Sequence, residues 1–535
     1  MSQDDPYSRS ADEFVEPPRT FRQTLKHLGP GMILVGSVVG SGELIMTTKL
    51  GAVAGFVLLW FVLLSCFLKV VVQAEIARHT ISSGRTFLDV FNALPGPSAV
   101  RPHWLTLRWM SLVMTACVIG VSVYVAIEES QRTSLVTVGL VVGIALACGV
   151  AAVAERAAVT RRYSGRTTQS PGRPVLNWFT WMWLASTLLV FVNAGAILGG
   201  AGQALELAFP NAFDTDGSRI WTLIIAAGSA AVLLTGSYGS LEKTLITLVG
   251  TFTFLTIFCT VALQWTDYAI TPDDVGRGLT LALPADIDRD LLLVALAMFA
   301  GTGVAYGEMW TYTYWCVEKG YARNTGESQP GDAWPRRARG WIRVMYTDVL
   351  LTMVIYTVST VCFYFLGAAV LFAEGLNPDG KETLSTLGRV YTGSIGNWAA
   401  TLFVVGAFFV LLSTVLAGAA GSGRLLADAL GVMGLIPRDD FPRRKKLIRV
   451  FIVVSLVLYS VAYWLFENPP KMLAITSSLI GAMMYPVVGF GVLWLRHREL
   501  DPRIAPGRWT TTWLWICAVT VAVISPLGIV IAMLI

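Results

Sequence analysis

Long apolar runs separated by short polar stretches make up most of this chain. Each run approaches or exceeds the ~20 residues that a helix needs to cross the hydrocarbon core of a bilayer. Thirteen such segments lie at 28–50, 54–78, 106–127, 134–154, 176–206, 219–237, 244–266, 290–315, 344–372, 397–427, 448–466, 472–495 and 511–534. The pattern predicts an all-α polytopic membrane protein with about 13 transmembrane helices.

The charges in the connections alternate along the chain. Lys and Arg are concentrated at 78–108, 155–173, 318–343, 438–449 and 496–508. The connections between these are acidic or carry few charges, as at 267–290. Basic loops remain on the cytoplasmic side of a membrane. We therefore expect a plasma (inner) membrane protein with its amino terminus in the cytoplasm and its carboxyl terminus outside.

Composition narrows the class further. Of 535 residues, 54% are hydrophobic and 14% are charged, whereas soluble domains carry about 25% charged residues, so a string of soluble domains is excluded. The net charge of +5 is spread over short loops, and nucleic acid is not an expected partner. The seven cysteines form no CxxC pair, which favours buried thiols over a disulfide or a thiolate metal site.

Two regions are expected to lie outside the helical core. Residues 1–27 are polar and interrupted by prolines, so we expect a disordered cytoplasmic tail without a cleavable signal. The breaker clusters FNALPGPSAV (91–100) and QSPGRPVLNW (169–178) enclose two spans and a basic loop. A transmembrane hairpin inserted at 98–172 would enter and leave on the same side, so the orientation of every later helix would be preserved.

Two of the apolar segments carry a glutamate directly after a glycine. They contain VVGSGELI (38–45) and GVAYGEMW (303–310), which share the pattern V-x-x-G-E. A carboxylate near the bilayer centre costs roughly 2.5–3.5 kcal/mol, so Glu43 and Glu308 are functional candidates that should face a cavity. The loop charges orient these two spans oppositely. Paired, glycine-interrupted spans of opposite orientation are typical of the central site of a transporter.

The residues ahead of the second glutamate add another kind of ligand. Ala300-Gly301-Thr302-Gly303 can unwind, and the carbonyl oxygens exposed there are tolerated at membrane depth only where they line a cavity. Carbonyl and carboxylate oxygens are hard ligands, which suit Mg, Ca or Mn rather than soft metals. The pattern therefore indicates a cation site between the two interrupted spans.

The stretch GPGMILVGSVVGSGELIMTTKLGAVAGFVLLW (29–60) surrounds the first glutamate. It resembles, without gaps, the first helix and the start of the second helix of the Nramp family of divalent metal transporters. The resemblance implies a LeuT-like inverted five-helix repeat, with an extra C-terminal helix and the inserted two-helix hairpin. It divides the chain into core helices 1–2 at 28–97, core helices 3–5 at 173–268, core helices 6–10 at 269–495, and a final loop and helix at 496–535.

The signature positions of that family carry different residues here. Gly40-Ser41-Gly42-Glu43 stands where the family has Asp-Pro-Gly-Asn, and Ala305-Tyr306-Gly307-Glu308 stands where it has Met-Pro-His-Asn. The resemblance implies a substrate site at Gly40, Glu43, Thr302, Ala305 and Glu308, with the two glutamates as the metal-binding side chains. Because the methionine thioether is lost, the preference for softer transition metals should weaken.

Several other polar residues lie in apolar segments. Ser478, Asn193 and Tyr306 are expected to surround the ligands, and Asn193 stands where the family carries an acidic residue on its proton path. Transport without proton coupling would then be driven by the membrane potential, which supplies about 2.3 kcal/mol per charge per 100 mV. Lys69 is expected to snorkel or to pair with another helix, with a place beside the site's ligands as the alternative, and Asp348 is expected to be a solvated helix cap.

The expected function is transport of divalent cations, preferably Mg or Mn, by alternating access through this central site. The cation is the substrate and no cofactor is expected. Catalysis is not expected either, because the sequence shows no nucleophile–base pair or metal-binding His spacing. The expected partners are the cation and the bilayer, and the expected state is a monomer. Two alternatives stay open: a transporter of an amino acid or amine on the same fold, and a transport-inactive sensor.

Overall fold

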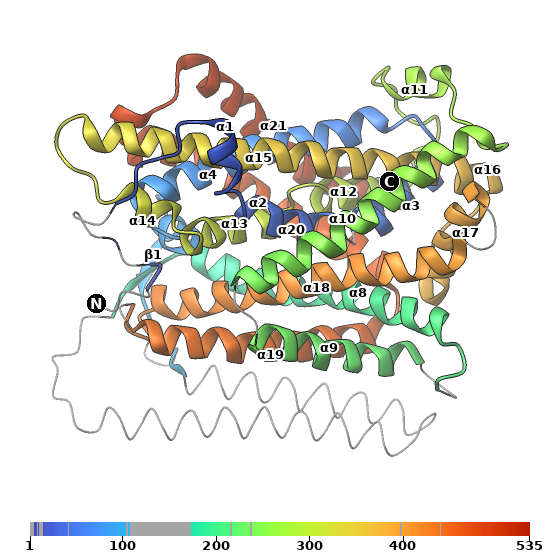
Figure 1. The fold of residues 1–535 in the computed structure, drawn as a ribbon, viewed down its shortest axis with the longest axis horizontal. Coiled ribbons are helices and arrows are strands. Elements are labelled where there is room, and N and C mark those ends of the chain that lie inside the picture. The colour runs from blue at the N-terminus through green and yellow to red at the C-terminus, as the bar shows by residue number, and fades with distance from the viewer. Residues whose placement is uncertain are drawn as a thin grey trace.

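The computed structural model describes residues 5–7, 9, 14–40, 42–102, 105–107, 173–213, 217–235, 238–395, 399–438 and 440–534. In this part of the chain, long helices lie side by side along one common direction (Figure 1). Nine of the described helices are long and apolar enough to cross a membrane, and one bent pair makes a tenth span. The all-α membrane class is confirmed. The number thirteen stays a prediction, because the spans expected at 106–127 and 134–154 fall almost wholly outside the described residues.

The helices follow the predicted apolar runs, and several begin at side-chain caps. Asn177, Asp288, Asp440 and Asn468 each accept a hydrogen bond from a backbone N–H of the first helical turn, which satisfies one of the donors that a helix start leaves free.

The main helices are α2 (Pro30–Val38), η1 (Gly42–Thr47), α3 (Thr48–Ala54), α4 (Leu59–Ser83), α8 (Trp178–Ala208), α9 (Gly217–Thr235), α10 (Tyr238–Ala262), α12 (Arg289–Gly301), α13 (Tyr306–Glu318), α15 (Ala333–Leu366), α17 (Thr383–Ile395), α18 (Ala399–Val432), α19 (Phe441–Phe466), α20 (Pro469–Trp494) and α21 (Arg508–Leu534). The shorter ones are α1 (Phe21–Leu25), α5 (Phe87–Phe91), η2 (Leu263–Trp265), α11 (Pro272–Gly278), α14 (Tyr321–Thr325), η3 (Gly367–Leu371), α16 (Phe372–Glu374), η4 (Gly380–Glu382), η5 (Leu495–Glu499) and η6 (Pro502–Ile504).

Two spans are broken where the glycines predict a break. The first bends by 41° between α2 and the π-helix η1. In the second, α12 ends at Gly301 and α13 begins at Tyr306, and Gly303 has φ +63°, a left-handed conformation that favours glycine. A Cβ at Gly42 would lie 2.1 Å from the carbonyl oxygen of Gly301. Glycine therefore lets the two breaks pass in direct contact.

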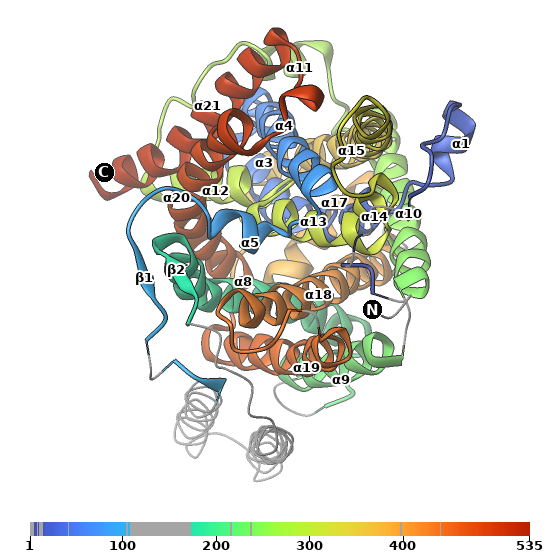
Figure 2. The ribbon, with the colours of Figure 1, turned by 90° about the vertical axis from the view of Figure 1, so that its left-hand side faces the viewer.

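The two ends of the predicted insertion lie side by side. Strand β1 (Ser98–Val100) pairs antiparallel with β2 (Val175–Asn177), with Ala99 opposite Leu176 (Figure 2). The chain therefore leaves and re-enters the described part at one place, as a hairpin between the two breaker clusters requires. From residue 108 onward the inserted hairpin expected at 98–172 lies outside the described residues, so it stays a prediction.

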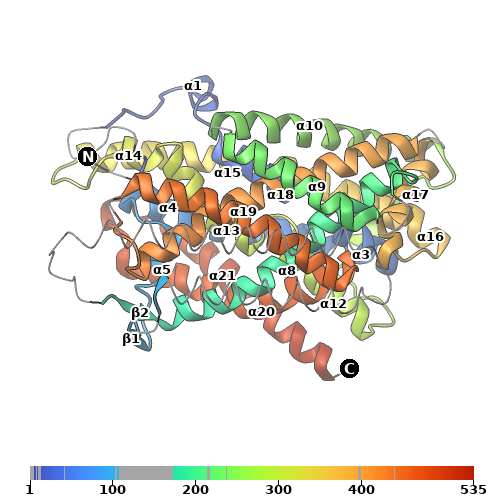
Figure 3. The same cartoon turned by 90° about the horizontal axis from the view of Figure 1, so that it is seen from below.

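Within the described residues, four of the basic loops gather at one end of the bundle. Arg503 donates to the carbonyl of Gln329 at 2.8 Å, and Arg438 pairs with Asp89 at 2.7 Å. Arg85, beside Asp89, lies 3.6 Å from Glu499, so the two pairs of loops are joined. Figure 3 shows the amino terminus and α14 at this end and the carboxyl terminus at the other. Both the separation of the two termini and the grouping of the loops agree with the alternating loop charges.

The amino-terminal tail makes more contacts than its composition suggests. The hydroxyl of Tyr7 donates to Glu318 at 3.0 Å, and the indole N–H of Trp341 donates to the carbonyl of Val15 at 2.9 Å. For the described part of 1–27, the expectation of disorder is therefore wrong. Its aromatic and backbone groups find partners on helices that are more than three hundred residues away in sequence, and composition carries no information about such contacts.

Candidate functional site

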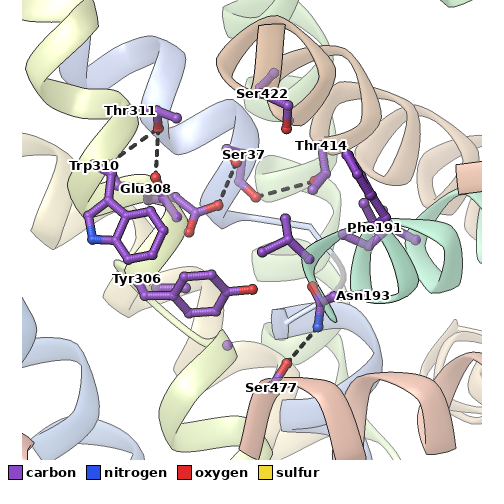
Figure 4. Close-up of a pocket in the computed structure, with 18 of the residues that line it drawn as sticks. Ser37, Phe191, Asn193, Tyr306, Glu308, Trp310, Thr311, Thr414, Ser422 and Ser477 are labelled. Carbon is purple, nitrogen blue, oxygen red and sulfur yellow. Dashed lines mark hydrogen bonds between the residues drawn. The ribbon is translucent and has the colours of Figure 1, made fainter. Parts of the chain in front are cut away.

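A cavity of about 130 Å³ lies between the two broken spans and helices α8, α18 and α20 (Figure 4). It has room for several waters, since one water needs about 10–15 Å³ of such space. Aromatic rings form much of the wall: Trp183, Phe191, Tyr306, Trp310, Trp315 and Tyr459. The polar side chains that line it are Ser37, Thr187, Asn193, Glu308, Thr311, Thr414, Ser422 and Ser477. Among the described residues, Glu308 is the one charged side chain in this lining.

Glu308 projects from the first turn of α13 and is half-buried. Its Oε1 accepts a hydrogen bond of 2.7 Å from the hydroxyl of Ser37 on α2, and the carbonyl of Ser37 accepts one of 3.3 Å from Thr414 on α18 (Figure 4). The position at a helix N-terminus also favours a negative charge. One short hydrogen bond therefore holds the carboxylate of the second broken span against the first.

Glu43 is fully buried, and it is not among the residues that line the cavity. Its Oε1 accepts from the N–H of Gly303 at 2.9 Å and from the hydroxyl of Thr360 on α15 at 3.3 Å, and its Oε2 accepts from the N–H of Gly40 at 3.4 Å. The expectation that Glu43 and Glu308 enter one cavity is therefore wrong. Because both breaks free backbone N–H groups, the Glu43 carboxylate turns toward those donors.

Lys69 on α4 occupies the other side of the second break. It is fully buried, and its ammonium donates to the carbonyl of Phe299 at 2.5 Å and to the carbonyl of Thr302. Of the expectations for Lys69, pairing with another helix is confirmed and snorkelling is wrong, while the alternative of a place beside the ligands agrees with its contact to the second break. The carbonyl of Thr302, expected as a ligand, already accepts from Lys69, and its side-chain oxygen lies 3.1 Å from that of Thr47.

The remaining predicted residues divide between the cavity and its surroundings. Ala305, Tyr306 and Asn193 line the cavity, whereas Gly40 and Ser478 do not. The hydroxyl of Ser478 donates instead to a backbone carbonyl of α12 at 3.2 Å.

The neighbouring Ser477 is the residue of α20 that reaches the cavity. Its hydroxyl accepts from the amide of Asn193 at 2.8 Å. Ser478 was expected to surround the ligands rather than to line the cavity, and the two serines differ because adjacent residues of a helix face different neighbours. Ser37 and Thr414 also line the cavity, and no feature of the sequence distinguishes them from other hydroxyl residues in apolar helices.

Asp348 on α15 is buried, so the expectation of a solvated cap is wrong. Its carboxylate accepts from the N–H of Gly31 at 2.6 Å, from the N–H of Gly29 at 3.3 Å and from the hydroxyl of Tyr312 at 2.9 Å. It does cap a helix, but the helix is α2, more than three hundred residues earlier in the chain. Glycine at position 31 leaves the space, since a Cβ there would lie 2.8 Å from Asp348 Oδ2.

The cavity therefore offers one carboxylate, several hydroxyls, one amide, the thioether of Met46 and a set of aromatic faces. Its oxygen ligands are hard, and its rings attract cations through their electron-rich faces. No group of three His, Cys, Asp or Glu side chains that could hold a metal is found within the described residues. The arrangement is suited to a cation that keeps part of its hydration shell or brings other groups of its own.

Comparison with known sequences identifies one family. The chain matches the family described as Nramp, natural resistance-associated macrophage protein-like, over residues 132–531. The match contains the second broken span and helices α8 to α20. It does not contain 29–60, where the resemblance to the family is seen in the sequence. None of the curated proteins matches this sequence.

Solved structures extend the likeness to nearly the whole chain. A mutant of the manganese transporter of Eremococcus coleocola aligns with a TM-score of 0.57 at 12% identity, covering 98% of this chain and 92% of that one. Mhp1, a nucleobase-cation-symport-1 family transporter with bromovinylhydantoin bound, gives 0.50 at 12%, covering 99% and 95%. MhsT in complex with L-phenylalanine gives 0.50 at 13%, covering 94% and 97%. At these identities the likeness shows the fold, and the LeuT-like fold class is confirmed.

Proposed function

This chain belongs to the Nramp family, whose members are transporters rather than enzymes, and from this premise we propose that it carries a divalent cation, Mg or Mn, across the membrane. The membrane is the plasma (inner) membrane, with the basic-loop end of the bundle in the cytoplasm and the substrate bound between the two broken spans. Family membership and the apolar helices support this proposal. The loop charges support the orientation.

The position of Glu308 is the observation that carries the proposal. It places the one charged side chain found in the lining where both spans are interrupted, opposite the hydroxyl of Ser37. A divalent cation would bind the carboxylate directly and keep several of its waters, as Mg commonly does. The cavity volume of about 130 Å³ is sufficient for such a partly hydrated ion. Ala305 supplies no thioether at its own position, and the thioether in the lining is that of Met46 on η1; the preference for hard ions rests on the carboxylate and hydroxyl oxygens.

Alternating access would use the two breaks as hinges. At one end of the site, Asp348 joins the start of α2, which precedes the first break, to Tyr312 of α13, which follows the second break. On the other side, the close contact of Gly42 with Gly301 joins η1 to α12. Each half of one broken span is thus tied to the neighbouring half of the other. Two paired units that rotate about the breaks would expose the cavity to one side of the membrane at a time.

We further propose that this transport is not coupled to protons. Asn193 faces the cavity from α8, where the resemblance to the family implies an acidic residue, and Gly307 stands at the position of a family histidine. The membrane potential alone supplies about 4.6 kcal/mol per 100 mV for an ion of charge +2. That driving force is sufficient for accumulation without a second ion.

A second candidate substrate is a small organic amine. The specific observation in its favour is the aromatic wall, in which the rings of Tyr306 and Trp310 pack against each other 5.4 Å apart next to Glu308. A single carboxylate among aromatic faces is a common way to bind an ammonium group. The same LeuT-like fold holds organic ligands in the structures of Mhp1 and MhsT.

Uptake into proteoliposomes separates these candidates. We expect Mn and Mg to enter when the inside is negative, without a change of internal pH, and Glu308→Gln to abolish entry. Ser478→Ala is the matched control, because its hydroxyl lies beside the site but outside the cavity. Stabilisation by alkylamines together with indifference to every divalent ion would favour the amine. Absence of flux for all of these solutes would instead indicate a transport-inactive sensor.

A further inference from the structure

The second break is held from both sides by opposite charges. Lys69 donates to the carbonyl of Thr302, and Glu43 accepts from the N–H of Gly303 at 2.9 Å. These two groups are the ends of a single peptide unit, since the carbonyl of residue 302 and the N–H of residue 303 share one amide plane. The cation and the anion are therefore linked through one peptide of the unwound segment.

The surroundings of the Lys69 ammonium are those of a cation site. The carbonyl of Phe299 accepts from Lys69 and also from the hydroxyl of Ser65 at 3.2 Å, and the ammonium lies 5.4 Å from the centre of the Phe299 ring. Carbonyls at the C-terminal end of a half-helix carry the negative end of its dipole. In broken-helix transporters, such carbonyls coordinate small cations.

We propose that Lys69 is a tethered cation, which fills a monovalent cation site formed by the carbonyls of Phe299 and Thr302. The carboxylate of Glu43 is its counter-charge, and the two side chains bond to opposite ends of the peptide unit between residues 302 and 303. The break then needs no free Na⁺ or K⁺ to hold its carbonyls together. Because the Glu43 charge is balanced inside the protein, Glu308 is left as the net negative charge that a substrate meets.

A second buried lysine, Lys49, has different surroundings from those of Lys69. Lys49 donates to the carbonyl of Pro378 at 2.9 Å and lies 3.8 Å from the carboxylate of Asp379, which is largely exposed. That lysine is a partner for a carboxylate at the edge of the protein. Lys69 has no exposure, and none of the ion pairs found within the described ranges includes it. Its ammonium is bonded to backbone carbonyls, as a bound metal ion would be.

The decisive variant is Lys69→Ala, which removes the ammonium and leaves its carbonyl partners in place. Thermal unfolding is measured for the detergent-solubilised full chain in choline, sodium, potassium and methylammonium chloride at equal ionic strength. We expect the midpoint of the wild-type protein to be the same in all four salts. For Lys69→Ala we expect a lower midpoint in choline, raised by about 5 °C in sodium or methylammonium, because a ligand bound only by the folded state stabilises it.

Two control variants distinguish a cation site from general damage to the protein. Lys69→Arg keeps a cation and should show no dependence on the salt. Lys49→Ala should lose stability to the same extent in all four salts. Should Lys69→Ala unfold at one midpoint in every salt, or fail to fold in all of them, the tethered-cation proposal is wrong.

The counter-charge is tested by a double variant. Lys69→Met combined with Glu43→Gln removes both charges, so it should be more stable than Lys69→Met alone and insensitive to the salt. A double variant that is no more stable than the single one would overturn the assignment of Glu43. Wild-type uptake should also be equal in sodium, potassium and choline. This last readout rests on the proposed transport function, whereas the unfolding measurements do not, so the two ideas can fail separately.

Discussion

The two glutamates of the V-x-x-G-E motifs reach opposite situations in the fold. Glu43 is fully buried and accepts three hydrogen bonds, two of them from backbone N–H groups at the breaks. Glu308 is half-buried, lines the cavity and accepts one short hydrogen bond from Ser37. The same five-residue pattern thus produces one carboxylate that the protein satisfies by itself and one that it leaves available.

The difference shows what makes a buried carboxylate functional. A carboxylate surrounded by donors and a nearby cation has already recovered its desolvation cost within the protein. One that faces a polar cavity with a single donor can still gain from an incoming cation. A glutamate in an apolar helix therefore identifies a candidate functional position. The number of hydrogen-bond donors around its carboxylate then indicates whether it stabilises the fold or remains available to bind a substrate.

The sharpest test of this contrast, with the largest expected effect, is Glu308→Gln. Removal of one partner of a buried charge pair costs about 4 kcal/mol, which corresponds to about 1,000-fold in affinity. We expect uptake of the transported cation to fall below detection, while the unfolding midpoint stays the same or rises. Uptake at wild-type levels would show that the carboxylate of Glu308 is not the binding group.

Glu43→Gln should give the reverse pattern. Because the change leaves Lys69 without its counter-charge, we expect a loss of about 3 kcal/mol in the free energy of unfolding. Variant molecules that remain folded should show nearly unchanged KM. Chemical denaturation and uptake kinetics on the same preparation measure both quantities. A raised KM at wild-type stability would place Glu43 among the ligands and end the distinction between the two glutamates.

Asp348→Asn extends the contrast to a third acidic residue. Like Glu43, Asp348 is buried and accepts two backbone N–H groups and a hydroxyl. We expect the amide to cost about 2 kcal/mol of stability, since a charged cap at the start of α2 is lost. KM should not change. A selective loss of substrate affinity would contradict the idea that a buried carboxylate with several hydrogen-bond donors stabilises the fold and does not bind the substrate.

The smallest effect is expected on α20, where two adjacent serines face different ways. Ser477 lines the cavity, and Ser478 bonds to a carbonyl of α12. Ser477→Ala should raise KM by about fivefold, which corresponds to about 1 kcal/mol for one hydrogen bond. Ser478→Ala should leave KM unchanged. Equal effects in the two variants would mean that the cavity face of α20 is assigned to the wrong residue.

Several features of the site could be predicted because they depend on local chemistry. Apolar runs locate the helices, since only a helix satisfies its own backbone groups in lipid. Gly303, which adopts positive φ, marks the break in the second span, and Gly42 marks the one in the first. The two glutamates were found because an acidic side chain is costly at that depth. Each of these signals lies within one short stretch of sequence.

What only the tertiary structure decided is how these local features face one another. Within a helix, a shift of one residue turns a side chain by about 100°, so the sequence could not distinguish Ser477 from Ser478. Nor could it show that Glu43 turns to Gly303, or that Lys69 meets the carbonyl of Thr302, because those partners lie more than two hundred residues away. The sequence alone determined the spans, the breaks and the presence of charge at mid-membrane. The packing of distant helices determined which charge is neutralised and which one a substrate can reach.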